Sequence, residues 1–270
     1  MDTMQRVRPA QLTWRDHSEV ARSGHRDYFE RNGFTVISGL LSPPQVARAA
    51  DEVDRIVAHA HQMPQVRIIG HRNPRLPSYD LEDAAAGATI VRKITGLRAL
   101  SPLLCGLLVE PPELIDVLHA LLGERVELYR DALMLKTARI GQEKPWHQDA
   151  VYWPFRPMRL ISAMIALDNA DAFNGCLQVI PGSHREIRAH EKVNAELQLT
   201  PGPEEEDACY VPLAAGDCLV FHSLLLHASG CNASDRPRRA SICSYSPGKL
   251  MSLDPGQDSP LCLSERILTP

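Results

Sequence analysis

The sequence lacks the long apolar runs of a membrane protein and the basic surplus of a nucleic-acid-binding protein. No stretch of 18 or more residues is continuously apolar, so we expect no membrane-spanning helix. The net charge is −4 and the pI is near 6.3, which gives no electrostatic reason to expect nucleic acid or an anionic membrane as a partner. The first 19 residues are mixed and polar, without the apolar centre of a signal peptide.

Cysteine pairs with the spacing of a metal site are also missing. The seven cysteines are an odd number and none of them form a C-x-x-C pair; they are Cys105, Cys176, Cys209, Cys218, Cys231, Cys243 and Cys262. This usage predicts reduced, mostly buried thiols in a cytoplasmic protein. For the same reason, we do not expect a zinc site with cysteine ligands.

Helical signals dominate the first half of the chain and strand signals the second half. The expected helices cover residues 22–31, 42–57, 101–108 and 111–122, and the expected strands cover 33–38, 126–136, 160–167, 176–180, 208–212, 217–221 and 240–245. Residues 198–207 are expected to form a solvated acidic loop. With 44% hydrophobic residues and no break in composition, the sequence predicts one domain over residues 1–270. Its class would be α+β, with a mainly β core, an antiparallel barrel or double sheet, buttressed by N-terminal helices.

Two H-x-D pairs occur, and they differ in local structure. About 0.7 such pairs are expected by chance from 11 His and 17 Asp in 270 residues, so the pattern alone is weak evidence. His25 and Asp27 lie in a predicted helix, where positions i and i+2 point about 200° apart and cannot share a metal ion. His147 and Asp149 lie in an apparently extended segment, where positions i and i+2 share one face. The second pair is therefore the candidate metal site.

A third ligand and a cation follow later in the chain. His222 and His227 compete for the third place, and a spacing of five would put them on opposite faces of a regular strand. Two His and one carboxylate are the ligand set of a non-haem Fe(II) site with open positions. Arg238 or Arg239 could then clamp the carboxylate of an oxo-acid co-substrate, and only one of these neighbours can point into the site.

Short motifs through most of the chain carry a resemblance to a known family. They are Phe29-Glu30-Arg31-Asn32-Gly33-Phe34, Ser38-Gly39-Leu40-Leu41-Ser42-Pro43, His147-Gln148-Asp149-Ala150-Val151-Tyr152-Trp153-Pro154-Phe155-Arg156-Pro157, Asn174-Gly175-Cys176-Leu177, Pro181-Gly182-Ser183-His184 and His227-Ala228-Ser229-Gly230-Cys231-Asn232, followed by Arg238-Arg239-Ala240. In this order they resemble the phytanoyl-CoA dioxygenase family of Fe(II)/2-oxoglutarate oxygenases. The resemblance implies a double-stranded β-helix, also called a jelly roll or cupin-like fold.

The resemblance also implies roles for individual residues. It implies His147, Asp149 and His227 as iron ligands, and Arg238, with Ser229 close by, as the site for the distal carboxylate of 2-oxoglutarate. Met134 and Lys93 match positions that contact the co-substrate in family members, and Lys136 is a rival for Lys93. Met164 departs from the family pattern, in which Trp is common at that position. The cofactors implied are Fe(II), 2-oxoglutarate and O2.

The predicted function is hydroxylation of an unactivated C–H bond in a small-molecule metabolite or natural-product intermediate. A carboxylate at Asp149 favours hydroxylation, or desaturation or ring closure, over halogenation, because related halogenases have a small residue there. The alternatives are a 2-hydroxylase of an acyl-CoA such as phytanoyl-CoA, a non-catalytic metal-binding jelly roll, and an enzyme with another metal, such as an isomerase. The chain ends Ile267-Leu268-Thr269-Pro270, with no peroxisomal address evident.

Other side chains near these motifs have both structural and functional interpretations. The aromatic residues around the metal pair could form a substrate wall or core; they are Trp146, Tyr152, Trp153 and Phe155. Arg156 and Arg159 could meet an anionic group of the substrate, although surface or structural roles are more common for arginine. His184 and Glu186 are another metal-like pair, but their place after Pro181-Gly182 favours a turn.

Overall fold

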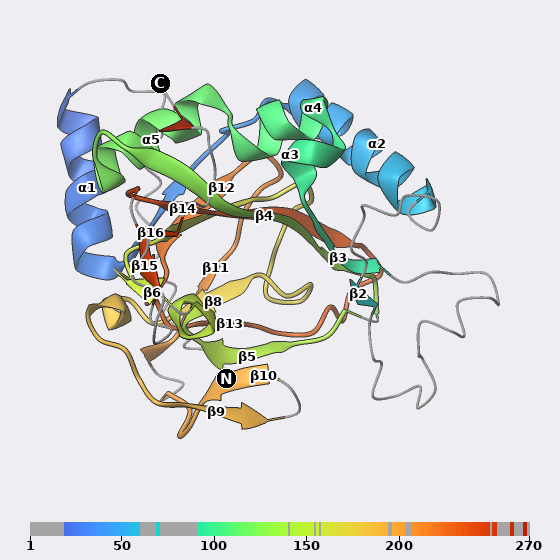
Figure 1. The fold of residues 1–270 in the computed structure, drawn as a ribbon. Helices are drawn as coiled ribbons and strands as arrows, with labels where there is room; N and C mark the ends of the chain where they lie inside the picture. Colours follow the sequence, from blue (N-terminus) through green and yellow to red (C-terminus); the bar gives the residue numbers. More distant parts are fainter. Residues whose placement is uncertain are drawn as a thin grey trace.

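A helical layer covers one face of a large antiparallel sheet. The computed structural model describes residues 19–59, 69–70, 91–139, 141–153, 155–156, 158–193, 196–203, 207–248, 250–252, 260–261 and 267–268. Its helices are α1 (Glu19–Asn32), α2 (Pro43–His59), α3 (Leu97–Leu100), α4 (Pro102–Leu104) and α5 (Pro112–Leu122), with a π-helical turn η3 (Cys105–Val109) and 3-10 turns η4 (Asp149–Tyr152) and η5 (Ser183–Arg185). Figure 1 shows α2 to α5 above strands β4 and β14.

Most strands belong to two sheets. The large sheet has the order β1-β12-β7-β14-β4-β3-β2, with β17 also paired to β4; the strands are β1 (Phe34–Ile37), β12 (Cys218–His222), β7 (Ile161–Ile165), β14 (Arg238–Ser246), β4 (Val126–Lys136), β3 (Val91–Thr95), β2 (Ile69–Gly70) and β17 (Ile267–Leu268). The small sheet has the order β11-β8-β13-β5, from β11 (Cys209–Val211), β8 (Leu177–Val179), β13 (His227–Ser229) and β5 (Lys144–His147). A hairpin of β9 (His190–Val193) and β10 (Glu196–Leu199) and a small sheet of β16 (Pro260–Leu261), β15 (Leu250–Ser252) and β6 (Phe155–Arg156) complete the set.

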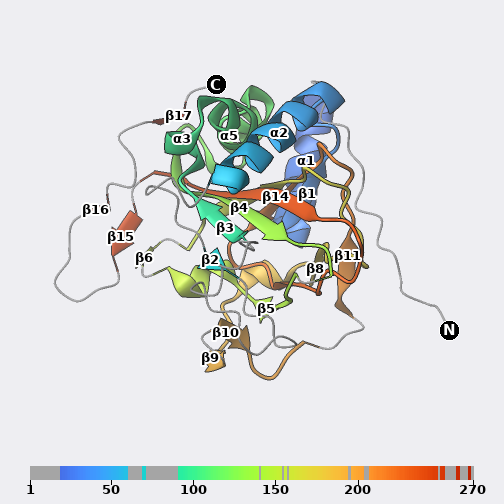
Figure 2. The same ribbon diagram turned by 90° about the vertical axis from the view of Figure 1, so that its right-hand side faces the viewer.

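The two main sheets face each other and enclose an apolar layer. Figures 1 and 2 show β5 and β8 on the side of β4 and β14 that is opposite helices α2 to α5, and Figure 1 shows β13 there too. Phe34, Met164, Val179, Phe221 and Ala240 belong to one buried cluster between the sheets. All pairings in both sheets are antiparallel, so the architecture is a double-stranded β-helix with helices on one side. The predicted fold class is confirmed.

The side chains of strand β14 alternate between two buried cores, one under the helices and one between the sheets. Cys243 and Tyr245 are completely buried in the core under the helices. Ala240 and Ile242 belong to the other core, between the sheets. Because side chains alternate along a strand, even-numbered positions of β14 face the interior of the jelly roll and odd-numbered positions face the helices. Arg238 therefore lies on the interior face and Arg239 on the helical side.

Helix α2 follows the sequence signals closely. The Gln45 side chain accepts a hydrogen bond from the backbone N of Ser42 at 2.8 Å, which is the reciprocal contact of a capping box. Ala49, Val53 and Ile56 are completely buried at helical spacing. Full burial of such side chains stabilises the fold by roughly 1.5–3 kcal/mol for each Val or Ile. The helix is thereby fixed over the outer face of the large sheet.

The structure corrects two predicted elements. The predicted helix over residues 101–108 is short α-helix α4 followed by the π-helical turn η3, with Ser101 as the N-cap. The acidic loop predicted over residues 198–207 contains the end of β10, because Glu196–Leu199 pairs with His190–Val193. Residues 204–206 lie outside the described residues. The other predicted helices and strands are found, with ends that differ by a few residues.

The structure bears on the expectations for membrane-spanning helices and for the cysteines. Among the residues described, no helix is both long and apolar enough to cross a membrane. Six cysteines are free thiols, and Cys231 is the exposed one; Cys262 lies outside the described residues. The cytoplasmic location stays a prediction. The single domain over residues 1–270 also stays a prediction.

Candidate functional site

A cavity of about 340 Å³ lies between the two main sheets. Its lining comes from the interior faces of β3, β4 and β14 on one side and from β5, β8 and β13 on the other. The residues predicted for the site all border it; they are Lys93, Met134, His147, Asp149, His227, Ser229 and Arg238. Residues separated by up to 145 positions in the chain therefore meet in one space.

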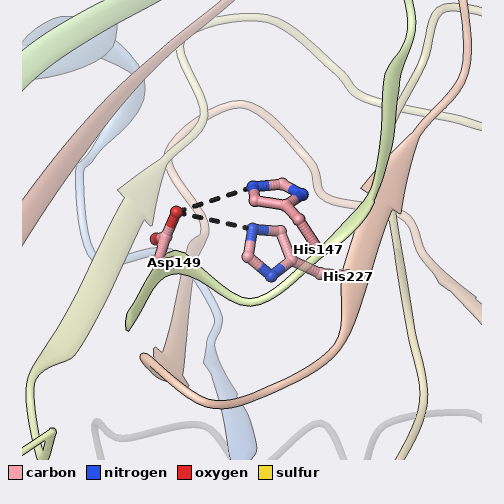
Figure 3. A group of neighbouring side chains, drawn as sticks. All are labelled: His147, Asp149 and His227. Carbon is pink, nitrogen blue, oxygen red and sulfur yellow. Dashed lines mark ion pairs between the residues drawn. The ribbon is translucent and has the colours of Figure 1, made fainter. Parts of the chain in front are cut away.

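Three of these side chains converge as a candidate metal site. His147 ends β5 and lies directly opposite His227 in β13. Asp149 Oδ1 lies 3.6 Å from His147 Nε2 and 3.9 Å from His227 Nε2. One ligand atom from each residue falls within 4.8 Å of the others, and all three side chains are buried. Figure 3 shows both imidazole rings turned toward the Asp149 carboxylate.

The backbone between the two ligands differs in part from the prediction. His147 and Asp149 do not lie on one strand, because β5 ends at His147 and Asp149 opens the 3-10 turn η4. The residue between them, Gln148, keeps an extended backbone with φ −113° and ψ 130°. The i and i+2 relation of an extended chain therefore persists over these three residues and brings both side chains to one side.

Hydrogen bonds fix the tautomer of both histidines. His147 Nδ1 lies 2.9 Å from the carbonyl O of Pro145, and His227 Nδ1 lies 2.9 Å from the carbonyl O of Leu225. A carbonyl only accepts, so each Nδ1 donates its proton and Nε2 is the ring nitrogen that faces the metal position. Burial lowers the pKa of His227 to about 4, with a smaller effect from the neighbouring His147, so His227 is neutral at pH 7. Both rings thus present a metal-binding nitrogen toward Asp149.

Asp149 is held as a carboxylate. Burial acts to raise its pKa, but the side chains of His147, His227 and Arg130 beside it outweigh that effect and hold the pKa well below its usual range. Ser162 donates a hydrogen bond to Asp149 Oδ2 at 3.3 Å, and Ser162 also contacts Ser244 at 3.0 Å. Oδ1 is therefore the oxygen that faces the histidines, while Oδ2 faces the large sheet.

Gln148 is a positioning residue that the sequence analysis did not single out. It is completely buried, and its side chain donates to the carbonyls of Glu186 at 2.8 Å and Leu224 at 2.6 Å. Its Oε1 accepts from the backbone N of Arg188 at 2.9 Å. These contacts attach the turn between His147 and Asp149 to the loop before β13 and to the segment between η5 and β9. No motif in the sequence points to this role, because the partners are backbone groups distant in the chain.

Arg238 reaches the cavity from β14. It is 3% exposed and donates to the carbonyl O of Gly175 at 3.0 Å, while its Nε has no hydrogen-bond partner among the described residues. Burial lowers the pKa of Arg238 to about 10. Arg239 points away and pairs with Asp168 at 2.8 Å and with Asp54 at 2.7 Å. The alternation of β14 thus places Arg238, and not Arg239, in the cavity.

Two lysines that border the cavity, Lys93 and Lys136, differ in their hydrogen-bond partners. Lys136 donates to the carbonyl O of Gln142 at 2.8 Å and to that of Gly230. Lys93 has no hydrogen bond or ion pair with any residue that the structure describes. Burial, with the charge of Arg130 nearby, lowers its pKa to about 8. Of the two rivals, Lys93 is thus the lysine whose ammonium group is available to a ligand.

Comparison with known proteins identifies the family of the chain. A family model described as Phytanoyl-CoA dioxygenase (PhyH) matches residues 29–240 of the chain. The chain belongs to this family. Peroxisomal phytanoyl-CoA dioxygenase of Mus musculus is 28% identical over 258 residues, which cover 91% of this chain and 74% of that protein. Ectoine dioxygenase of Bordetella bronchiseptica is 28% identical over 238 residues, which cover 80% of this chain and 72% of that protein.

A solved structure supports the same assignment. The crystal structure of EvdO2 from Micromonospora carbonacea var. aurantiaca, complexed with 2-oxoglutarate, superposes with a TM-score of 0.65 at 26% identity. The match covers 82% of this chain and 89% of that chain. This member of the phytanoyl-CoA dioxygenase family is accordingly a non-haem iron enzyme that depends on Fe(II), 2-oxoglutarate and O2. The non-catalytic jelly roll and the isomerase without an oxo-acid are thereby set aside.

The residues present fit both groups. Two imidazoles and one carboxylate that converge from one side are a donor set suited to Fe(II), and they leave coordination positions open. The unpartnered Nε of the buried Arg238 is a donor that a carboxylate would satisfy. This free donor therefore fits the distal end of 2-oxoglutarate.

The other histidines that were candidate metal ligands lie outside the metal cluster. His222 ends β12 rather than sharing a strand with His227, and its Nδ1 accepts from the backbone N of Leu224 at 3.0 Å. His184 contacts the carbonyl O of Glu30 at 3.2 Å from the turn η5, and His25 contacts Thr35 at 3.0 Å, so neither joins the metal cluster.

Of the aromatic and basic residues that flank the metal pair in the sequence, some border the cavity and others do not. Tyr152 borders the cavity, whereas Trp153 is 5% exposed and packs with Tyr129, so it serves the core. Trp146 is partly buried and does not border the cavity. Arg159 donates to the carbonyl O of Leu121 at 3.4 Å, away from the cavity. The side chains of Phe155 and Arg156 lie outside the described residues.

Proposed function

We propose that this enzyme hydroxylates an unactivated C–H bond of a small-molecule metabolite or natural-product intermediate. His147, Asp149 and His227 would hold the iron. One observation carries the proposal: a cluster of two histidines and one carboxylate shares a cavity with a buried guanidinium whose Nε has no hydrogen-bond partner among the described residues. The first group suits a metal ion with open coordination positions, and the second suits the carboxylate of an oxo-acid.

Arg238 would bind the distal carboxylate of 2-oxoglutarate, with Ser229 beside it. Both side chains are buried and border the cavity, and a planar guanidinium can give two parallel hydrogen bonds to a carboxylate. Met134 would contact the carbon chain of the co-substrate. Lys93 is favoured over Lys136 as a further contact, because Lys136 already donates to two carbonyl groups.

The bound groups supply the oxidising chemistry, and the protein supplies position. The carbonyls of Pro145 and Leu225 hold the two rings with Nε2 toward the metal position. Ser162 orients Asp149 so that Oδ1 faces the same point. Since the carboxylate of Asp149 occupies the place that a halogenase would leave for chloride, hydroxylation is favoured, with desaturation or ring closure as related outcomes.

A second candidate is 2-hydroxylation of an acyl-CoA. It is supported by the similarity to mouse phytanoyl-CoA dioxygenase, which extends over 91% of this chain. The cavity of about 340 Å³ is at the low end of the range of roughly 300–1,000 Å³ for small-molecule sites. It would accept the reacting end of an acyl thioester beside the co-substrate, with the coenzyme A moiety outside. The small-molecule hydroxylase remains the first candidate.

Anaerobic titration of the purified protein with Fe(II) against a competing chelator tests the metal site. We expect one Fe(II) per chain in the wild type, and affinity at least ~10- to 100-fold lower in Asp149→Ala and in His227→Ala. His222→Ala is the matched control, since this histidine is the sequence rival of His227 and lies outside the cluster. Iron binding that is unchanged in Asp149→Ala, or lost in His222→Ala alone, would contradict the proposal.

A further inference from the structure

The cavity carries an excess of positive charge in a protein that is negative overall. Six basic and three acidic side chains border it; the basic ones are Arg92, Lys93, Arg130, Lys136, Lys144 and Arg238, and the acidic ones are Glu143, Asp149 and Glu196. The lining thus has a formal charge of +3, whereas the whole chain has −4. Like charges enclosed in one cavity raise its affinity for an anion.

Several of these cations already have partners. Arg92 and Lys144 both pair with Glu196, and Lys144 also donates to Tyr152 at 2.9 Å. Lys136 is satisfied by backbone carbonyls. Among the described residues this leaves Lys93, Arg130 and Arg238 as the cavity cations that are neither hydrogen-bonded to a carboxylate nor held by several carbonyl groups. Arg238 is accounted for by the co-substrate in the proposed function, and Lys93 is assigned there as a further contact.

Arg130 is held in place without being satisfied. Its guanidinium stacks over the ring of Trp153, with 5.6 Å from Cζ to the ring centroid, and Trp153 is itself fixed against Tyr129. Its Nε is buried and has no hydrogen-bond partner among the described residues. The contact of its Nη2 with Asp149 Oδ2 is 3.9 Å, which is too long for a hydrogen bond. The side chain is 28% exposed.

Arg130 and Arg238 belong to opposite ends of the cavity. In the pairing of β4 with β14, Arg130 lies opposite Ser244 and Arg238 lies opposite Lys136. These two register positions are six residues apart, or roughly 20 Å along the strands. Arg238 is attached to Gly175, and Arg130 lies beside Asp149. A five-carbon co-substrate anchored at Arg238 therefore leaves Arg130 for a different ligand.

The charges of the proposed cofactors do not neutralise this surplus. Fe(II) would bring +2 and 2-oxoglutarate −2, so together they leave the formal +3 of the lining unchanged. A buried donor atom of a cation that has no hydrogen-bond partner, such as the Nε of Arg130, is unfavourable unless a ligand supplies an acceptor. We propose that the substrate of this enzyme carries a carboxylate that Arg130 binds on the side of the metal site opposite the co-substrate clamp. The inference rests on the proposed function and names the class of its substrate.

The placement also limits which carbon reacts. The Arg130 guanidinium lies 3.9 Å from Asp149, whose other oxygen faces the two histidines. A carboxylate bound by Arg130 is therefore only a few bonds from the metal position. The C–H bond to be hydroxylated lies close to the anionic end of the substrate. Tyr152 and Met164 border the same space and would contact the remainder of the molecule.

Matched pairs of neutral and anionic probes test this assignment. The protein is loaded anaerobically with Fe(II) and saturating 2-oxoglutarate, which occupies Arg238, and is titrated by calorimetry with hexanoate, hexanamide, benzoate and benzamide. We expect each carboxylate to bind about 10- to 100-fold more tightly than its amide, since a charge-assisted hydrogen bond is lost in the amide. Arg130→Gln should remove this preference, and Arg130→Lys should retain part of it.

Arg159→Gln is the control, because Arg159 is one of two arginines that the sequence suggested for an anionic substrate group and it lies away from the cavity. It should keep the full preference for carboxylates. Equal binding of amides and carboxylates by the wild type, no saturable binding of either carboxylate, or a preference that survives in Arg130→Gln overturns the inference. The absorption band of the Fe(II)–2-oxoglutarate complex distinguishes a failure of the proposed function from a failure of this inference alone. Its absence in the wild type refutes the proposed function, and its presence without the preference refutes only the inference.

Discussion

The substitution Arg238→Met should make the ligand-free protein more stable while it abolishes stabilisation by 2-oxoglutarate. Burial lowers the pKa of Arg238 from 12.5 to about 10. A change of this size corresponds to roughly 3 kcal/mol of unfavourable burial of the charged form. At pH 7 the guanidinium is charged in both the folded and the unfolded chain, so this full unfavourable contribution is present; it would be relieved only as pH rises through about 10.

The expected magnitude combines this burial with the one hydrogen bond that is lost. The charged hydrogen bond to the carbonyl O of Gly175 contributes roughly 1.5 kcal/mol in the other direction. Methionine fills a similar volume without a charge, so the net gain is roughly 1 to 2 kcal/mol, or about 2 to 4 °C in Tm for a chain of this size. In the wild type, 2-oxoglutarate at 100 times its Kd should add about 2.7 kcal/mol beyond the effect of Fe(II).

Thermal unfolding under anaerobic conditions, with and without Fe(II) and 2-oxoglutarate, measures both effects. The order of the two Tm values should reverse. Without ligands the Tm of Arg238→Met should be higher than that of the wild type, and with Fe(II) and 2-oxoglutarate the Tm of the wild type should be higher. Arg239→Met is the matched control, since it loses the ion pairs with Asp168 and Asp54 but should keep the ligand-dependent increase. A ligand-free Arg238→Met protein that is less stable than the wild type by more than ~1 kcal/mol would refute the reasoning. So would full stabilisation of that variant by 2-oxoglutarate.

Three other substitutions have defined outcomes. Gln148→Leu removes three hydrogen bonds of a completely buried side chain, so we expect a loss of roughly 2 to 5 kcal/mol in urea unfolding and weaker Fe(II) binding; a change below 1 kcal/mol would argue against its positioning role. The pKa of Lys93 is about 8, and only its charged form attracts a carboxylate, so kcat/KM for 2-oxoglutarate should fall as pH rises through about 8. Lys93→Met should flatten that profile, and an identical profile in both proteins would count against the contact. Gly175→Ala forces a side chain onto φ +84° and places its Cβ 2.5 Å from the carbonyl O of Gly230, so we expect roughly 1 to 3 kcal/mol of destabilisation and a higher KM for 2-oxoglutarate. Wild-type stability in that variant would show that the backbone there can move freely.

Local sequence signals were sufficient for much of the fold. The box at Ser42 and Gln45 and the apolar spacing of Ala49, Val53 and Ile56 depend on neighbours within one helix, and the helix forms where they predict it. The junction at residues 101–109 was less accessible, because a π-helical turn differs from an α-helix by one residue per hydrogen-bonded turn, which periodicity over so short a segment does not resolve. Hairpin β9–β10 was hidden by its polar composition.

The site was predictable in its members but not in its supporting contacts. The residue types singled out His147 and Asp149 but left His222 or His227 and Arg238 or Arg239 open, and the family resemblance implied His227 and Arg238. The direct pairing of His147 with His227 joins strands 80 residues apart, and no local pattern specifies it. Arg130 was overlooked, although it shares the parity of Met134 and Lys136 on β4 and so the face that lines the cavity. That parity was the available signal.

The most direct test of the central claim is the visible absorption band that forms when Fe(II) and 2-oxoglutarate bind together without oxygen. The measurement compares the wild type, Arg238→Ala and Arg239→Ala over a titration with 2-oxoglutarate. We predict a saturable band with one co-substrate per chain in the wild type and in Arg239→Ala, and its loss or a shift to at least ~10-fold higher 2-oxoglutarate concentration in Arg238→Ala. No band in the wild type, or the same titration curve in Arg238→Ala, would contradict the account.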